Sequence, residues 1–459
     1  MRDIPPRTGH ALDSKQMTTS AQDPQDSPPP GAGRALEARP EVIAVQRRTV
    51  RTLVATQAVG GIGLSSAIAV AALLAKDVSG SDALAGLAQT AQVLGAALIS
   101  GLLAAYMSRH GRRPGLTLGY LLGALGAGVC ILAGTLRVFP LLLVGAVLLG
   151  ATTATNNQSR YAATDLAQPA RRGRDLSTVV WATTIGSVIG PNLAGPGGVV
   201  ATWLHLPPKT GPFLFGAAAM LAAAGIMSVR LRPDPLLLSR LQPSVTESPP
   251  GGALAPVVRH SAWTLITTRP LVRAAAVGMA MSYAVMVSVM VMTPIYMDHG
   301  HASLQIIGFV ISLHVLGMYA FSPLVGLAVD RFGGPPVLAA GGIVLLCALL
   351  LAGRSPAGPS VTLGAGLFLL GLGWSLGNVA SSTMLTAATP LERRPEVQGL
   401  ADMTTGFTAA AGGAGAGVVL GTVGFGWLNA GASVLAVGVI VAALVAARHT
   451  VRPARKLFS

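Results

Sequence analysis

The sequence is dominated by long apolar segments that short polar loops separate. Most have roughly the 20 residues that an α-helix needs to cross the hydrocarbon core of a bilayer. A transmembrane barrel would instead show alternating strands of about 10 residues, which the sequence lacks. We therefore predict an all-α membrane protein with twelve transmembrane helices, at 53–75, 83–107, 115–136, 139–166, 176–194, 212–229, 271–297, 304–329, 337–351, 361–388, 397–420 and 424–447. Residues 199–206 either extend the fifth span or form a short external helix.

The composition supports lipid as the solvent. Only 11% of the 459 residues are charged, against about a quarter in soluble proteins, and 51% are hydrophobic. The net charge of +15 does not indicate a nucleic-acid partner, because the basic residues mostly flank the apolar segments. Both cysteines, Cys130 and Cys347, lie within apolar segments, so a disulfide framework is not expected.

The distribution of Lys and Arg predicts the orientation in the membrane. If the N-terminus is cytoplasmic, the inside loops and C-terminal tail carry 22 basic residues, and the outside loops carry only Lys76, Arg137, Lys209 and Arg354. Basic residues favour the cytoplasmic side, so both termini are predicted to be cytoplasmic. The Ala-, Gly- and Arg-rich composition with few Lys is typical of a high-GC bacterium, so we expect the bacterial inner membrane.

Polar segments divide the chain into five parts. Residues 1–46 have no apolar core of a signal peptide and are predicted to form a disordered cytoplasmic tail. Two six-helix bundles, 47–230 and 270–448, are joined by a Pro-rich, basic cytoplasmic linker at 231–269. Residues 449–459 form the second tail.

The two halves resemble each other at an offset of 222 residues. This offset aligns Gly111 with Gly333 and Asn156 with Asn378, and it places the Gly190-Pro191 pair on Gly412-Gly413. Parallel half-repeats place a substrate site at their interface near the bilayer midplane. The alternative is a chance alignment of Gly-rich helices.

The loops after the second and eighth spans resemble the loop motif of the major facilitator superfamily, Gly-x-x-x-Asp-Arg-x-Gly-Arg-Arg. The second copy has Gly326, Asp330, Arg331 and Gly333, and the first has Arg109, Gly111, Arg112 and Arg113. The first copy departs from the motif at Ser108 and Ala104. The resemblance covers nearly the whole chain after the tail and implies the major facilitator fold of two pseudo-symmetric six-helix bundles.

In this family, the Asp that Ser108 replaces would join a charge cluster that locks the outward-facing state. Asp165 could still pair with Arg109 or Arg112. Alternatively, these arginines serve only as topology determinants.

The fifth span is similar to the family's antiporter motif, Gly-x-x-x-Gly-Pro-x-x-Gly-Gly. The matching residues are Gly186, Gly190, Pro191 and Gly195, and Ala194 replaces one Gly. In the superfamily this motif is associated with exporters, especially drug–proton antiporters, so the resemblance favours export over uptake.

Polar and aromatic side chains within the spans predict the substrate pathway, because polar groups at membrane depth usually face the protein interior. Arg160 could bind an anionic substrate group, snorkel to the surface or pair with Asp165, and Trp374 could stack on a substrate or serve as packing. The Met-rich seventh span suits varied lipophilic substrates or is apolar filler. The predicted cavity residues are Gln57, Asn156, Asn157, Arg160, Tyr283, Met286, Trp374, Asn378 and Ser381.

A proton-coupled carrier needs a titratable group in its pathway, and three residues are candidates. His314 lies near the middle of the eighth span, but a buried histidine with one hydrogen bond is the commoner case. Asp402 lies about one turn into the eleventh span, and Asp165 could form a relay with Arg160.

We therefore predict a secondary transporter that exports small lipophilic or drug-like molecules by alternating access with proton coupling. One alternative is an uptake or exchange carrier for a polar or anionic metabolite, and another is a lipid-moving or sensing protein of the same fold. No nucleotide-binding Gly-x-x-x-x-Gly-Lys motif or metal-ligand spacing occurs, so we expect no enzyme activity, cofactor or metal. The expected partners are the substrate, membrane lipid and protons, and the expected state is a monomer.

Overall fold

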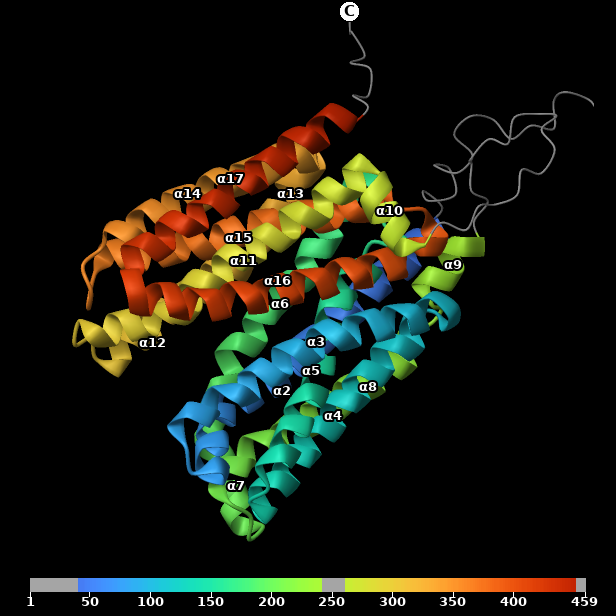
Figure 1. Ribbon diagram of the computed structural model, residues 1–459. Helices are drawn as coiled ribbons and strands as arrows, with labels where there is room; N and C mark the ends of the chain where they lie inside the picture. The colour runs from blue at the N-terminus through green and yellow to red at the C-terminus, as the bar shows by residue number, and fades with distance from the viewer. Residues whose placement is uncertain (1–39, 242–260, 451–459) are drawn as a thin grey trace, which may run out of the picture.

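A computed structural model describes residues 40–241 and 261–450 of the chain (Figure 1). Within them the protein is built of helices, and no strand occurs. The first half contains α2 (Pro40–Ser79), α3 (Asp82–His110), α4 (Arg112–Leu136), α5 (Phe139–Ala162), α6 (Arg172–Asn192), α7 (Ala194–Trp203) and α8 (Gly211–Arg230), with the short helices η2 (Pro169–Arg171) and η3 (Pro208–Thr210).

The second half repeats this pattern after two short helices, α9 (Pro235–Leu241) and α10 (Ala262–Thr268). It contains α11 (Pro270–His299), α12 (Leu304–Tyr319), α13 (Ser322–Phe332), α14 (Gly334–Arg354), α15 (Val361–Ala388), the short η4 (Leu391–Arg393), α16 (Arg394–Val423) and α17 (Phe425–His449). The twelve predicted spans thus correspond to ten long helices and two broken ones, α6–α7 and α12–α13.

Eleven segments of the described residues are long and apolar enough to cross a membrane. The fifth predicted span, 176–194, is not among them. Helix α6 carries several Ser and Thr residues, and its first turn contains Arg172, Arg174 and Asp175. Helix α6 is interrupted at Leu193, and α7 follows it. The segment 199–206 begins within α7 and extends three residues beyond its end at Trp203. The break agrees with the effect of a proline on the residues before it, because Pro196, in the first turn of α7, has no N–H to donate to the carbonyl group of Asn192.

Helix α2 begins earlier than the sequence indicates. Residues 40–46, assigned to the tail, form its first two turns, and Pro40 stands at its first position, where the missing N–H costs nothing. The remainder of the predicted tail, the middle of the linker (242–260) and residues 451–459 lie outside the described residues.

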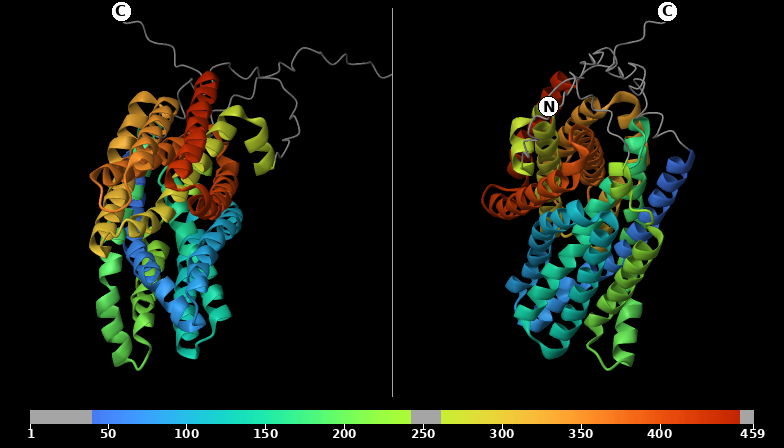
Figure 2. Two further views of the ribbon diagram at one scale, coloured as in Figure 1. Left: turned by 60° about the vertical axis from the view of Figure 1, so that its left-hand side comes forward. Right: turned by 90° about the vertical axis from the view of Figure 1, so that its right-hand side faces the viewer.

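The two halves form separate sets of packed helices, as Figures 1 and 2 show. The sets converge at the end of the molecule where α9 and α10 lie, which we call the linker end, and they diverge toward α7 and α12 (Figure 1). At the linker end α3 packs on α16, and α6 packs on α13. We call this boundary between the sets the seam.

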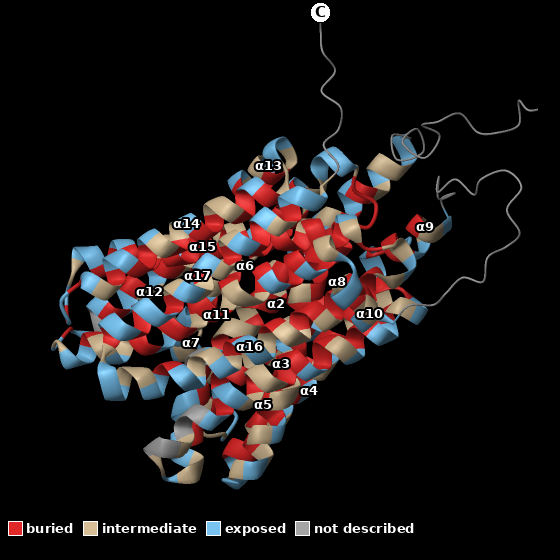
Figure 3. Ribbon diagram, turned by 45° about the horizontal axis from the view of Figure 1, so that its top comes forward, coloured by how far each residue is buried: buried red, intermediate tan, exposed pale blue. Residues whose placement is uncertain are grey.

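Burial follows the pattern of a membrane protein. Inward-facing residues are buried, while the outer faces of both sets are exposed (Figure 3). Those outer faces carry large apolar side chains such as Leu102, Leu324 and Val434, each more than 60% exposed. Apolar surface of this extent is stable against lipid but not against water.

The structure shows the repeat in register. Gly111 and Gly333 end α3 and α13 with φ values of 94° and 86°, a region that favours glycine. A Cβ at Gly190 would lie 3.0 Å from the carbonyl oxygen of Ile62 on α2, and one at Gly412 would lie 3.5 Å from that of Ala284 on α11. Positions 62 and 284 are again 222 residues apart, so the contact of α6 with α2 recurs between α16 and α11.

Candidate functional site

A buried ion pair joins the two sets across the seam. Arg160 lies in the last turn of α5, and its Nη2 is 2.6 Å from Oδ1 of Asp402 on α16. The two side chains are only 6% and 2% exposed. Asp402 also accepts hydrogen bonds from the Tyr161 hydroxyl at 3.3 Å and from Gln158 Nε2 at 3.0 Å. A carboxylate of the second half is therefore held by three donors from one helix of the first.

Arg160 makes a second contact across the seam. Its Nη1 donates to Oδ1 of Asn378 on α15 at 2.9 Å, and its buried Nε has no hydrogen-bond partner among the described residues. Asn156, the repeat mate of Asn378, instead accepts from the Tyr120 hydroxyl at 3.0 Å within the first set. The two asparagines thus share a register but not a partner.

A second buried guanidinium lies next to the first. Arg112, the first residue of α4, is 0% exposed and donates to Asp165 from Nε at 2.8 Å. It also donates to Gln158 Oε1 at 3.1 Å and, across the seam, to Gln398 Oε1 on α16 at 2.7 Å. Gln158 connects the two arginine centres, so the network extends without interruption from Asn378 to Gln398.

The predicted pair of Asp165 with Arg109 or Arg112 is confirmed, with Arg112 as the partner. The alternative in which Arg160 pairs with Asp165 is wrong. Helix α5 ends at Ala162, four residues before the predicted end of the span, and the following turn carries Asp165 toward α4. Asp402 lies eight residues after the start of α16, two turns rather than one inside the helix, where it reaches Arg160.

An aromatic cluster lies in the second set beside the ion pair. Trp374 on α15 packs edge-to-face against Tyr283 and Tyr319, with ring centroids 5.6 Å apart in both cases. Trp374 precedes Asn378, which accepts a hydrogen bond from Arg160, by one turn of α15. The cluster is completed by Met286 and Met318. Trp374 is 4% exposed, and its indole N–H has no partner among the described residues.

The structure places the remaining predicted site residues in different surroundings. Gln57 donates to the Thr183 hydroxyl at 2.9 Å and so joins α2 to α6. Asn157 is half-buried, and Ser381 is fully buried with no hydrogen-bond partner among the described residues. His314 is buried between α12 and α15, where Nδ1 lies 2.8 Å from the carbonyl oxygen of Leu367. A buried histidine with one hydrogen bond is the commoner case named above, as opposed to a proton-coupling group.

Sequence reasoning missed five members of the site: Gln158, Tyr161, Met318, Tyr319 and Gln398. A signal was present for Gln398. It precedes Asp402 by four residues, so both lie on one face of a helix otherwise rich in Gly and Ala. Two polar side chains on one face of such a helix indicate a buried polar contact.

Comparison with known proteins decides the family. The sequence profile of the Major Facilitator Superfamily matches residues 53–301 and 275–458. The chain belongs to the major facilitator superfamily. It is 36% identical to YddS, an uncharacterised MFS-type transporter of Bacillus subtilis (strain 168), over 82% of this chain and 85% of that protein. It is 29% identical to the riboflavin transporter RfnT of Brucella anthropi, over 83% and 92%.

Solved structures of the superfamily share the fold. The human organic anion transporter MFSD10 (TETRAN) superposes with a TM-score of 0.67 at 18% identity, covering 87% of this chain and 99% of that one. The transporter FucP in its outward conformation superposes with a TM-score of 0.63 at 16% identity, covering 88% and 98%. This protein is therefore a multi-pass membrane transporter of the superfamily.

The second copy of the superfamily loop motif forms a contact across the seam. Asp330 at the end of α13 accepts hydrogen bonds from the backbone N–H groups of Gly173 at 2.7 Å and Arg174 at 2.9 Å, at the start of α6. A carboxylate at a helix N-terminus is favoured by the helix dipole. Gly173 also allows close approach, because a Cβ there would lie 2.6 Å from the carbonyl oxygen of Gly326.

The first copy does not form the equivalent contact. Ser108 takes the place of Asp330, and its hydroxyl donates to the Ala105 carbonyl within its own helix. The residue that corresponds to Gly173 is Pro395, which has no N–H to offer. Asp234 instead accepts from the backbone N–H of Arg113 at 2.7 Å beside Gly111, while the side chains of Arg109 and Arg331 are exposed. The two motif copies at the linker end therefore differ. Only the second copy places a carboxylate on the N-terminus of a helix in the other set, and we call this contact of Asp330 with α6 the gate.

The antiporter motif lies where α6 meets α2. Gly186 packs against Gly61, and Gly190 packs against Ser65 and Ser66. Gly195 in α7 has open space around the position of a Cβ, so it is not part of this close contact.

The Asp330 contact can be tested by cysteine labelling. Ser177 is buried between α6 and α13, beside Gly326. In a background with Cys347→Ser, we expect Asp330→Ala to raise the maleimide labelling rate of Ser177→Cys about tenfold, because charge-assisted hydrogen bonds across the seam are lost. Ser108→Ala is the matched control and should leave the rate unchanged. Equal rates in both variants would show that Asp330 does not hold the gate closed.

Proposed function

We propose that this transporter exports small lipophilic molecules by alternating access and that proton binding at Asp402 drives the cycle. One observation carries the proposal. The ion pair of Arg160 and Asp402 crosses the seam, and Arg160 also bonds to Asn378, one turn of α15 from Trp374 of the aromatic cluster, so a coupling group and an apolar surface lie close together.

The position of the pair supports coupling. Opening the linker end requires α5 and α16 to separate, which would leave two buried charges without partners. Removal of one partner from a buried pair costs about 3–5 kcal/mol, and this value sets the scale of the cost of separation. A proton on Asp402 removes one charge and weakens the hold of Arg160 and Gln158 on α16. Protonation would therefore favour separation, and release of the proton would favour closure.

The aromatic cluster supports a lipophilic substrate. Trp374 and two tyrosines offer ring faces and edges, and Met286 and Met318 adapt to varied shapes. The relative RfnT is named as a riboflavin transporter, and riboflavin has a planar aromatic ring system that such a surface suits. The proposed cargo is a planar aromatic molecule of this general kind.

The direction of transport rests on the antiporter motif, and the convergence of the two sets indicates which side is open. The antiporter motif, which the resemblance associates with exporters, packs α6 closely against α2. The sets converge at the linker end, which the basic loops predict to be cytoplasmic (Figure 1). The arrangement is then an outward-facing one in the bacterial inner membrane, with both termini cytoplasmic.

The proposal is tested by transport in proteoliposomes with an imposed pH gradient. The substrate panel contains a lipophilic cationic dye, riboflavin and a small dicarboxylate. We expect movement of an aromatic substrate against the direction of proton flow, with loss of transport when a protonophore collapses the gradient. If the protein moves no member of the panel under either gradient polarity, or moves them equally without a gradient, proton-coupled export is excluded.

Substitution of Trp374 tests the binding surface. Trp374→Ala removes the shared partner of Tyr283 and Tyr319 and should slow transport of the aromatic substrate by about three- to tenfold. Trp374→Phe keeps a ring and should retain most of the rate. If both variants transport at the wild-type rate, Trp374 is packing rather than part of the substrate surface.

A second candidate function is exchange of an anionic metabolite. It is favoured by the buried Nε of Arg160, a donor with no partner among the described residues that an anion could satisfy. Transport of the dicarboxylate, abolished by Arg160→Gln, would support this function over export of lipophilic molecules.

A further inference from the structure

A cavity of about 310 Å3 at the linker end has no part in the proposed transport path. Its walls come from the first turns of α2, the turn after α5, η2 and the start of α6. Gln46 holds these walls together, because its Nε2 donates to the carbonyl oxygen of Ala163 and to Asp175, both at 2.6 Å.

The cavity is rich in positive charge. Arg47, Arg51 and Arg171 line it, against a single carboxylate from Asp175. Within the described residues, none of the three arginines forms an ion pair shorter than 4 Å. Gln46 already donates to one oxygen of Asp175, and this single carboxylate cannot balance three guanidinium groups. Net positive charge therefore remains for an added anion.

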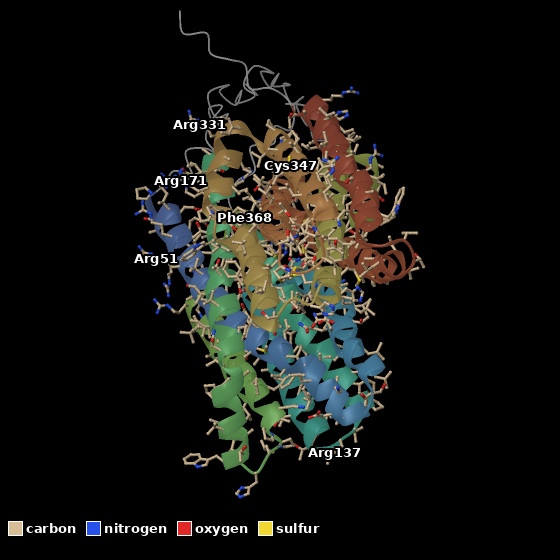
Figure 4. The ribbon with its side chains drawn as sticks, turned by 90° about the vertical axis from the view of Figure 1, so that its left-hand side faces the viewer. Arg51, Arg137, Arg171, Arg331, Cys347 and Phe368 are labelled. Carbon is tan, nitrogen blue, oxygen red and sulfur yellow. The ribbon has the colours of Figure 1, made fainter. Side chains whose placement is uncertain are left out.

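The rest of the wall is apolar, and its place fits the edge of a bilayer. Ile43, Val50 and Leu166 line the cavity beside the arginines. Its α2 residues end at Arg51, two residues before the predicted apolar segment begins at Leu53. Figure 4 shows Arg51 and Arg171 on the same side of the linker end, with Arg137 at the opposite end of the molecule.

We infer that this cavity binds a phosphate group, supplied by the headgroup of an anionic phospholipid or by phosphate in solution. Guanidinium groups match phosphate in geometry and charge, and clustered arginines at a membrane surface attract anionic lipid. A bound phosphate would join Arg47 and Arg51 on α2 to Arg171. Arg171 lies two residues before Gly173, whose N–H contacts Asp330, so the ligand would brace the closed gate.

The test uses the purified full chain in dodecyl maltoside with three probes: dioleoyl phosphatidylglycerol, dioleoyl phosphatidylcholine and inorganic phosphate. The midpoint of thermal unfolding is followed against probe concentration to obtain an apparent affinity. We expect phosphatidylglycerol, but not phosphatidylcholine, to raise the midpoint. The triple variant R47Q/R51Q/R171Q should bind phosphatidylglycerol at least about tenfold more weakly.

A matched triple variant separates this site from general attraction to a basic surface. R230Q/R273Q/R448Q removes three other exposed arginines and should leave the affinity within about twofold of the wild type. Ile43→Trp keeps every charge but fills the cavity, and it should also weaken binding.

The probes distinguish the source of the phosphate. Saturable stabilisation by inorganic phosphate, lost in the cavity triple variant, identifies a soluble ligand, whereas stabilisation by phosphatidylglycerol alone identifies a lipid. The inference is overturned if the two triple variants lose equal affinity or if Ile43→Trp binds as tightly as the wild type.

Discussion

Asp402→Asn is expected to abolish transport driven by a pH gradient and to lower the free energy of unfolding by about 3 kcal/mol. The substitution keeps the shape of the side chain but removes its charge. Arg160 is then left buried without a counter-charge, because Asn378, Tyr161 and the new amide offer it only neutral oxygens. The measurements are proteoliposome transport with an imposed gradient and chemical unfolding in mixed micelles.

The double variant R160Q/D402N separates stability from coupling. It removes both charges at once, so no uncompensated ion remains at the seam, and most of the lost stability should return. Transport coupled to protons should not return, because the titratable group is still absent. Downhill movement of substrate without a gradient is the expected residual activity.

Asp77→Asn is the matched control. Asp77 also lies in an ion pair, with Lys209 at 2.6 Å, but both side chains are more than 40% exposed and lie at the far end of the first set. Exposed pairs of this kind contribute little to stability, so this variant should transport and unfold like the wild type. Wild-type coupling in Asp402→Asn would remove Asp402 from the mechanism.

The sequence was sufficient for most of the fold because lipid imposes a length on each apolar segment. Pattern alone was less informative where a span is polar. The segment 176–194 was predicted as an apolar span, but α6 does not qualify as one by composition. The offset of 222 residues could also be read from the sequence, because glycines recur at equivalent positions in the two halves. In the structure, Gly190 and Gly412 lie against carbonyl groups of equivalent residues.

The site was predicted less completely because it depends on contacts between the halves. The arginines and Asp402 were identifiable as costly buried charges. The partner of Arg160 could not be identified from the sequence. Helix α5 ends at Ala162, and the turn after it directs Asp165 toward Arg112 and away from Arg160. A shift of four residues at one helix end, within the usual uncertainty of a boundary, changes which carboxylate meets which guanidinium.

Arg112→Gln is expected to destabilise the protein by about 3–5 kcal/mol, while Arg113→Gln changes stability by less than about 0.5 kcal/mol. Arg112 is fully buried, and its loss leaves Asp165 without a counter-charge and Gln398 without a donor. The side chain of Arg113 is half-buried and bonds to none of the described residues, so the neighbouring arginine is a control for charge and position. Chemical unfolding in mixed micelles measures both variants.

Two further variants show what Arg112 supplies. Arg112→Lys keeps the charge but cannot serve Asp165, Gln158 and Gln398 together, so its stability should lie between those of Arg112→Gln and the wild type. Combining Arg112→Gln with Asp165→Asn removes both buried charges and should recover part of the loss. If Arg112→Gln unfolds like Arg113→Gln, the buried network does not stabilise the first set.

The contacts of the two arginines indicate why their variants should differ in function. Arg112 bonds mainly within its own set, to Asp165 and Gln158, and only its contact with Gln398 crosses the seam. The contacts with Asp165 and Gln158 can persist while the sets move apart. Loss of Arg112 should therefore reduce stability more than it reduces proton coupling. The ion pair of Arg160 and Asp402 lies entirely across the seam, so in the proposed cycle it breaks whenever the two sets separate. A variant set in which Arg112→Gln retains proton-dependent transport per folded molecule, while Asp402→Asn loses it, would distinguish the two roles.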